Sequence, residues 1–330
     1  TYNSKDAVNI VFFSSQEQAK EYSDFLLTIT PFKENKKSFN FFYIDDYTPE
    51  CKRYKDIAVL CNNKELTKKA SSCPNDYLVI LKDEPAEIRS SAYMNVMSLN
   101  SNHQLTVLTH EIGHAFANLA EEYIPANIPR GSKNCQSSCN KFEVSDGCFQ
   151  GCSKSNYYRS IENGIMRTLL STNYGIFNEK TILEKISKNT NSILTGFAIE
   201  ENTETPCINE NYLLIEGILD SNKINIIDKS IEAGCAGANG AGDFEYSLIL
   251  EDNSTLTTGE FNPELIFTDV QKEAQEYIEG TTFLSNQPFL LKIPLIENAK
   301  SLEISREGEI LSEINLQNME SVFCKLKWYL

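Results

Sequence analysis

The chain has 330 residues, of which 41% are hydrophobic and 23% charged, and these are the proportions of a folded globular protein. Its formal net charge of −16 would repel phosphates, so we expect no nucleic-acid partner. No run of about 18 apolar residues occurs, so we expect no membrane span, and the composition does not indicate an oligomeric state.

The N-terminal part of the chain predicts a mixed α/β domain. Three short apolar runs predict buried strands: Val8–Phe13, Phe39–Asp46 and Asp76–Lys82. Ser15 is placed to cap a helix that follows the first of these runs. Residues 92–99 alternate weakly and predict an edge strand. Residues 104–119 are apolar almost all round, which predicts a helix buried beneath the sheet.

The composition changes from about Glu200, where short alternating stretches are joined by Asn, Gly and Asp turns. One of these stretches is residues 257–269. The spacing predicts an all-β, Ig-like sandwich, so we expect a first domain at 1–199 and a second at 200–330. The glycine-rich residues 233–243 follow no strand-to-helix context, which predicts a flexible loop and not a phosphate cradle.

The cysteines suggest an oxidising compartment. Four of the ten lie close together: Cys135, Cys139, Cys148 and Cys152. Reduced thiols, a structural zinc site with four thiolates, and two disulfides are the alternatives. An even count in a hydrophilic loop favours disulfides, and the CxxxC spacing is wider than the CxxC of most zinc ribbons. We therefore expect a secreted or cell-surface protein. Three cysteines lie before this cluster and three after it, so either one bridge joins the two regions or two cysteines stay free.

The stretch THEIGHAFANLAEEY, residues 109–123, contains two of only three histidines in the chain. Residues four apart share one face of a helix, so His110 and His114 can present their imidazoles to one ion. With Glu111 between them they form an HExxH pattern, which is typical of two zinc ligands and a general base. The pattern also arises by chance, but two histidines and a glutamate buried in an apolar helix are costly without a metal. Nothing in the sequence indicates calcium.

A catalytic zinc needs a third protein ligand. The remaining histidine, His103, lies about two turns from the first motif histidine, and we expect it at the surface. The ligand is then a carboxylate, but on an unbroken helix Glu121 would lie about 16 Å along the axis from that histidine. We therefore predict that the helix stops just before Asn118, which adopts the left-handed conformation, so that Glu121 turns back toward the metal. Glu122 is the alternative ligand, or else a partner of a ligand histidine.

HEIGHAFANLAEEY resembles the HExGHxxxxLxDEY signature of the IgA peptidase family of zinc metalloendopeptidases. The segments NIVFF, PFKENKKSFNFFYID and DYLVIL upstream and GCFQGCSKSNYYRSIENGIMR downstream are similar to further motifs of that family, over roughly residues 7–190. Two positions differ, because the family usually has Asp at Glu121 and Glu at Gln150. The resemblance implies a metzincin-like α/β zincin domain with a mixed sheet and an active-site helix. It also implies that Met166 lies in a turn under the zinc, whereas a methionine in such a setting is otherwise more often simply core.

The function implied by the resemblance is a zinc-dependent endopeptidase with one catalytic Zn²⁺, acting on extracellular proteins or peptides, with Glu111 as general base. Zinc suits this role because it lowers the pKa of bound water to about 7 and polarises a carbonyl. One alternative is a catalytically inactive, peptidase-like adhesion or carbohydrate-binding surface protein, against which the intact motif argues. Another is a structural zinc protein that uses the four clustered cysteines.

Several other residues are candidates for supporting roles. Tyr123, Tyr158 and Arg159 are candidates for stabilising the oxyanion or holding the substrate, although such residues are more often structural. The expected edge strand at residues 92–99 is a docking surface for an extended substrate backbone. The cysteine-rich loop at 135–152 is expected to act as a scaffold beside the cleft.

Overall fold

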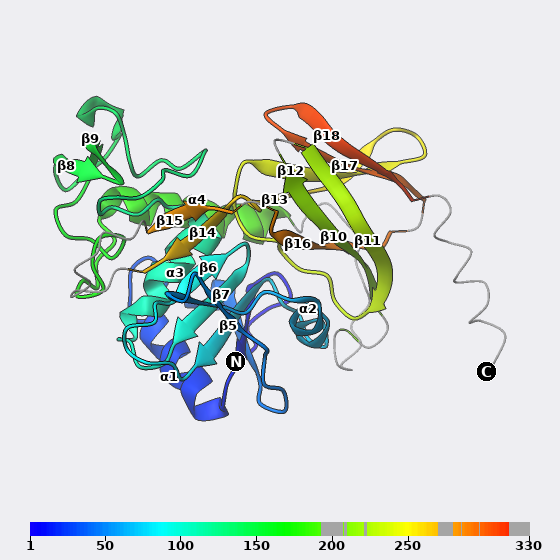
Figure 1. The fold of residues 1–330 in the computed structure, drawn as a ribbon, viewed down its shortest axis with the longest axis horizontal. Helices are drawn as coiled ribbons and strands as arrows, with labels where there is room; N and C mark the ends of the chain where they lie inside the picture. Colours follow the sequence, from blue (N-terminus) through cyan, green and yellow to red (C-terminus); the bar gives the residue numbers. More distant parts are fainter. Residues whose placement is uncertain are drawn as a thin grey trace.

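The computed structural model describes residues 1–192, 207, 210–220, 223–269, 280–284, 286–296 and 298–316. Its largest sheet is made, in spatial order, of β15 (Thr281–Phe283), β14 (Leu265–Thr268), β6 (Ser91–Tyr93), β7 (Val96–Asn100), β5 (Tyr77–Lys82), β1 (Val8–Phe13) and β2 (Phe39–Ile44). The four strands β7, β5, β1 and β2 run parallel, whereas β6, β14 and β15 are each antiparallel to their neighbours. The mixed sheet expected for the N-terminal part is therefore present (Figure 1).

Both faces of this sheet are covered, which explains why β1 is apolar along its whole length. Ile10 and Phe12 lie in a core shared with the helices α1 (Gln16–Leu26), α3 (Thr106–Ala117) and α4 (Ile176–Ser192). Val11 and Phe13 point to the opposite face, where they pack with α2 (Lys64–Ala70) and a hairpin of β3 (Lys52–Tyr54) and β4 (Ala58–Leu60). The predicted cap of α1 is confirmed, because the Ser15 side chain accepts a hydrogen bond from the backbone N–H of Gln18 at 3.3 Å.

The C-terminal part contains two antiparallel sheets. One is made of β11 (Lys223–Ala233), β10 (Asn211–Asp220) and β16 (Pro288–Pro294). The other is made of β13 (Thr255–Phe261), β12 (Phe244–Leu250), β17 (Ala299–Arg306) and β18 (Glu309–Asn315). Both sheets contribute to one apolar core, in which Leu291 and Phe289 of the first lie with Phe244 and Leu302 of the second. The two layers form a sandwich beside the large sheet (Figure 1).

The predicted division into residues 1–199 and 200–330 does not separate the sheets. The stretch 257–269 holds two strands: β13 belongs to the sandwich, and after Pro263 the chain enters β14, which pairs with β6 of the large sheet. Phe267 lies in the core under the helices while Ile266 lies in the sandwich core, so both faces of β14 are buried and the strand packs between the two parts of the chain. The position proposed for the boundary itself, near residue 200, lies outside the described residues.

The predicted edge strand at residues 92–99 is also wrong in two respects. It consists of β6 and β7, which form a tight hairpin that turns at Met94, where φ is 54°. The outer side of β6 is not an open edge, because β14 pairs with it. The orange strands β14 and β15 extend the sheet beyond the cyan β6 in Figure 1.

The glycine-rich residues 233–243, predicted to be a flexible loop, pack against the N-terminal part. A Cβ atom at Gly237 would lie 1.7 Å from the carbonyl oxygen of Asn75, and one at Gly240 would lie 2.8 Å from the carbonyl carbon of Met94. Glycine is required here because the two backbones approach too closely for any side chain.

The remaining elements are the strands β8 (Phe149–Cys152) and β9 (Lys154–Arg159) and two short 3-10 helices, η1 (Lys36–Ser38) and η2 (Cys139–Lys141). Within the described residues, every helix is too short or too polar to cross a membrane.

Candidate metal centre

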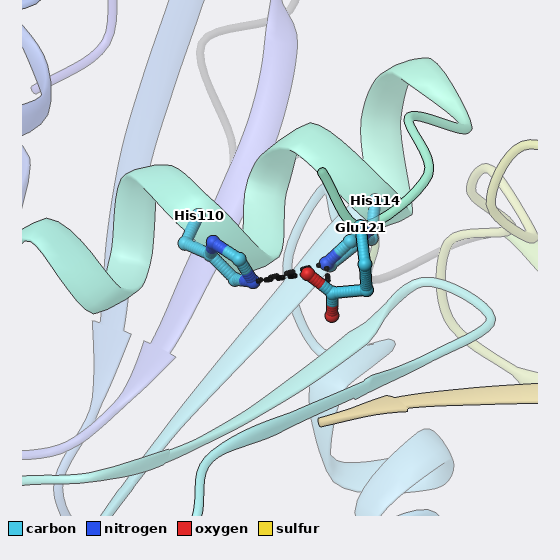
Figure 2. A group of neighbouring side chains, drawn as sticks. All are labelled: His110, His114 and Glu121. Carbon is cyan, nitrogen blue, oxygen red and sulfur yellow. Dashed lines mark hydrogen bonds and ion pairs between the residues drawn. The ribbon is translucent and has the colours of Figure 1, made fainter. Parts of the chain in front are cut away.

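The helix α3 carries two buried histidines whose orientation is set by backbone carbonyls. His110 Nδ1 lies 2.9 Å from the carbonyl oxygen of Ile165, and His114 Nδ1 lies 2.6 Å from that of Leu119. A carbonyl only accepts hydrogen bonds, so each Nδ1 carries a proton and each Nε2 is the nitrogen that would bind a metal ion. The two Nε2 atoms face one another at 3.1 Å (Figure 2).

The end of α3 brings a carboxylate back to this pair. The helix ends at Ala117, and Asn118 adopts the left-handed conformation (φ 51°, ψ 35°), as predicted. The backbone N–H groups of Asn118 and Leu119 donate to the carbonyls of His114 and Gly113, at 3.0 and 3.1 Å. The chain then reverses so that Glu121 lies beside the histidines.

The carboxylate of Glu121 faces both histidines. Its Oε2 lies 3.2 Å from His110 Nε2 and its Oε1 lies 3.1 Å from His114 Nε2. Three ligands of a tetrahedral zinc, each about 2.0–2.1 Å from the ion, lie about 3.3 Å from one another. One ligand atom from each of the three side chains lies within 4.8 Å of the others, so the group is close enough together to hold a metal ion.

The charges and hydrogen bonds of the cluster also fit a cation. Within the described part of the chain, no N–H or O–H group donates to the buried carboxylate oxygens of Glu111. Burial opposes protonation of His110, but the Glu121 carboxylate outweighs it and raises the pKa of His110 to about 10. The cluster, away from water, therefore stabilises a positive charge, which a proton or a metal ion can supply.

A turn beneath α3 holds the first histidine in place. The carbonyl of Ile165 accepts the proton of His110 Nδ1, and the next residue, Met166, is fully buried against the helix. A Cβ atom at Gly113 would lie 2.6 Å from Met166 Sδ. The structure thus places Met166 against α3 beside Gly113, and the close contact explains why glycine occupies position 113.

Glu122 does not join the cluster. Its Oε1 accepts hydrogen bonds from Asn134 Nδ2 at 3.1 Å and from Asn178 Nδ2 at 2.8 Å, and its backbone N–H donates to the carbonyl of Met166 at 2.8 Å. Burial raises the pKa of Glu122 to about 7. Glu122 therefore ties the segment after α3 to α4, and Glu121 is the carboxylate that lies with the histidines.

The cysteine-rich loop supports Glu121 from behind. Cys135–Cys152 and Cys139–Cys148 are disulfides, so the alternative of a four-thiolate zinc site is wrong. Next to Cys152, the hydroxyl of Ser153 donates to the carbonyl of Glu121 at 2.6 Å. This positioning role of Ser153 could not be predicted from local sequence patterns, because the contact joins residues 32 positions apart.

The other cysteines are also partly paired. Two further disulfides join Cys51 to Cys61 and Cys207 to Cys235, and Cys73 forms no disulfide with any residue that the structure describes. Cys324 lies outside the described residues.

The three further candidate residues make structural contacts. The hydroxyl of Tyr123 donates to the carbonyl of Thr268 at 2.7 Å, which links the segment after Glu121 to β14. The backbone of Tyr158 pairs with that of Gln136. The guanidinium of Arg159 donates to three backbone carbonyls, those of Gln150, Gly151 and Glu162, at 2.7, 2.6 and 3.0 Å.

His103 differs from the expectation of a surface residue. It precedes α3, its side chain is only 9% exposed, and its Nδ1 lies 2.9 Å from Asp269 Oδ2. Burial opposes protonation of His103, but Asp269 outweighs it and raises the pKa of the imidazole. The sequence analysis missed this ion pair because Asp269 lies 166 positions further along the chain.

The chain matches no protein-family model and no curated protein. The likeness of its motifs to the IgA peptidase family remains a resemblance.

Proposed function

We propose that the protein is a zinc-dependent endopeptidase with a metzincin-like catalytic part. The observation that carries the proposal is the convergence of His110 Nε2, His114 Nε2 and the Glu121 carboxylate at separations of 3.1–3.2 Å. Two histidines and one carboxylate are the protein ligands of a well-known class of catalytic zinc site, in which a fourth position stays open. The resemblance of HEIGHAFANLAEEY to the IgA peptidase signature points the same way.

The chemistry of the site would be hydrolysis of a peptide bond. When bound, zinc polarises the scissile carbonyl and makes water a better nucleophile. Glu111 follows the first ligand directly, its charge interacts with those of His110 and Glu121, and its carboxylate oxygens receive no hydrogen bond from the described residues. It is therefore the group that would take the proton of the attacking water and pass it to the leaving amine.

The remaining residues of the site act by holding these groups in place. The carbonyls of Ile165 and Leu119 keep the histidine protons on Nδ1, so that both Nε2 atoms stay available to the metal. The Cys135–Cys152 disulfide and Ser153 support the backbone of Glu121.

The four disulfides of the described residues support a secreted or cell-surface location, and hence an extracellular protein or peptide as substrate. The net charge of −16 supports the view that nucleic acid is not a partner.

The test combines metal content with cleavage of a mixture of quenched peptides and denatured proteins. We expect one zinc per chain in the wild type and in Glu111→Gln, and cleavage at least about 100-fold slower in the variant, because the general base is lost while the ligands remain. Glu122→Gln is the matched control, since it changes a buried carboxylate outside the cluster and should retain zinc.

Two other results would argue against a zinc-dependent endopeptidase. Zinc without Glu111-dependent cleavage would favour the inactive, peptidase-like surface protein. A chain that takes up no zinc would contradict the proposal.

A further inference from the structure

The sheet edge beside the metal centre is occupied by the protein's own chain. β14 lies antiparallel to β6, with Phe267 opposite Ala92 and Thr268 opposite Ser91. An extended peptide that docks by adding a strand to a sheet would use the same row of backbone groups on β6. The C-terminal part of the chain thus supplies a strand at the place where we expected a substrate backbone (Figure 1).

β14 also contacts the groups of the centre directly. The ring of Phe267 stacks on that of His114, with centroids 4.2 Å apart and planes 18° from parallel. The carbonyl of Thr268 accepts the hydroxyl proton of Tyr123, and Asp269, directly after β14, pairs with His103. These contacts hold β14 against the metal-binding side of α3.

The centre is closed to any substrate in this conformation. His110 and His114 are each 1% exposed, and Glu111 and Glu121 are 0% exposed. A peptide carbonyl cannot approach Glu111 unless part of the protein moves. β14 is joined to β6 through two residue pairs and its four residues are buried, so its departure from β6 would uncover the centre.

We propose that β14 is an inhibitory strand that occupies the substrate position on β6, so that the centre opens only when β14 leaves that edge. This inference rests on the proposed zinc peptidase function and adds a mode of regulation to it. With β14 displaced, an extended peptide would pair with Ser91–Tyr93 and place a carbonyl beside Glu111. The alternative is that β14 stays paired with β6 and forms a fixed side of the site.

A disulfide lock separates the two views. Ser91→Cys with Thr268→Cys would join residues that are opposite one another in the register of β6 and β14. We expect the oxidised double variant to keep its zinc, to cleave quenched peptides at least about tenfold more slowly than wild type, and to lose zinc more slowly to 1,10-phenanthroline. The single variant Ser91→Cys is the control for the substitution itself.

Weakening the strand should have the opposite effect. Phe267→Ala removes the ring that stacks on His114, and we expect peptide cleavage and zinc release to become about tenfold faster. Phe283→Ala is the matched control, because Phe283 lies on the neighbouring β15 with 57% of its surface exposed. Thermal unfolding of each variant would show that it is folded.

The results distinguish failure of this inference from failure of the proposed function. A locked protein that cleaves peptides and releases zinc as fast as wild type would overturn the inhibitory role of β14. If the zinc-loaded wild type instead cleaves no faster than Glu111→Gln, the peptidase function fails. In that case the zinc-release rates of the locked and Phe267→Ala proteins still show whether β14 controls access, and equal rates would overturn the inference.

Discussion

Two parts of the chain meet at the candidate metal centre, and they are held there in different ways. The segment from α3 to Met166 is fixed by the helix end at Asn118, by carbonyls that accept both histidine protons, and by the Cys135–Cys152 disulfide. β14 arrives from the C-terminal part of the chain and pairs with β6 through two residue pairs. All four of its residues are buried, with Leu265 and Phe267 in the core under the helices and Ile266 in the sandwich core.

In the proposed peptidase the two parts would have different roles. Metal ligands need fixed positions, because a metal tolerates little deviation in the distance of its donors. The proposed inhibitory strand would have to leave the edge of β6, and its buried side chains would then leave the two cores in which they pack.

We expect the largest effect from a substitution that removes a proposed metal ligand. Glu121→Gln keeps the size of the side chain but removes the carboxylate that lies 3.1–3.2 Å from both histidine nitrogens. We expect zinc affinity to fall by more than about 100-fold, because a ligand contributes more than the outer groups whose loss costs about 10–100-fold. Competition titration with a zinc chelator measures it.

Glu122→Gln distinguishes a specific from a general effect of charge. Glu122 is as buried as Glu121, but it bonds to Asn134 and Asn178 instead of the histidines. The zinc affinity of the Glu122→Gln variant should therefore stay within about tenfold of that of the wild type. Equal losses in the two variants would show that the cluster at Glu121 is not the metal site.

Local patterns in the sequence predicted where α3 ends and that a carboxylate would follow it. The spacing of His110 and His114, the need for a carboxylate and the left-handed tendency of asparagine were sufficient to predict a helix end at Asn118. They left Glu121 and Glu122 as alternatives, because adjacent residues after a turn differ only in the direction their side chains take. That direction depends on Asn134, Ser153 and Asn178, which the pattern did not contain.

The covering strand was not predictable in the same way. Leu265–Thr268 begins with three consecutive apolar residues and is wholly buried, and its two faces pack into two different cores. Which sheet it joins is decided by tertiary contacts such as that of Phe267 with His114, some 150 positions apart. His103 was placed at the surface for the same reason, since its partner Asp269 belongs to this distant segment.

The packing of Met166 against α3 can be tested through Gly113. Gly113→Ala would place a Cβ atom 2.6 Å from Met166 Sδ, in a core with no room for it. We expect a loss of up to about 3 kcal/mol in the free energy of unfolding, measured by chemical denaturation. Met166→Ala in the same chain should recover part of that loss, because it removes the sulfur that the new methyl group meets. A Gly113→Ala protein as stable as wild type would mean that Met166 does not pack beneath the helix.

The weakest expected effect concerns the junction between the sandwich and the N-terminal part. Lys292, on β16, is fully buried there, and its Nζ donates to the side-chain and backbone oxygens of Asn75. Burial lowers the pKa of Lys292 from 10.5 to about 8, against the opposing influence of Asp76 and Cys73. Between these two values the unfolded chain holds a proton that the folded chain lacks, so the contribution of this group to stability becomes less unfavourable as the pH rises.

Lys292→Met tests this junction, because the variant has no proton to exchange. Between pH 7.5 and 9.5, the free energy of unfolding of the wild type should rise by about 2 kcal/mol relative to that of the variant. Lys229→Met is the control, since Lys229 is an exposed lysine on β11 of the same sheet, and its difference from wild type should stay constant over that range. If the free energy of unfolding changes with pH equally in Lys292→Met and in the wild type, the amine of Lys292 is in contact with water. The contact of the sandwich with Asn75 would then be open to solvent.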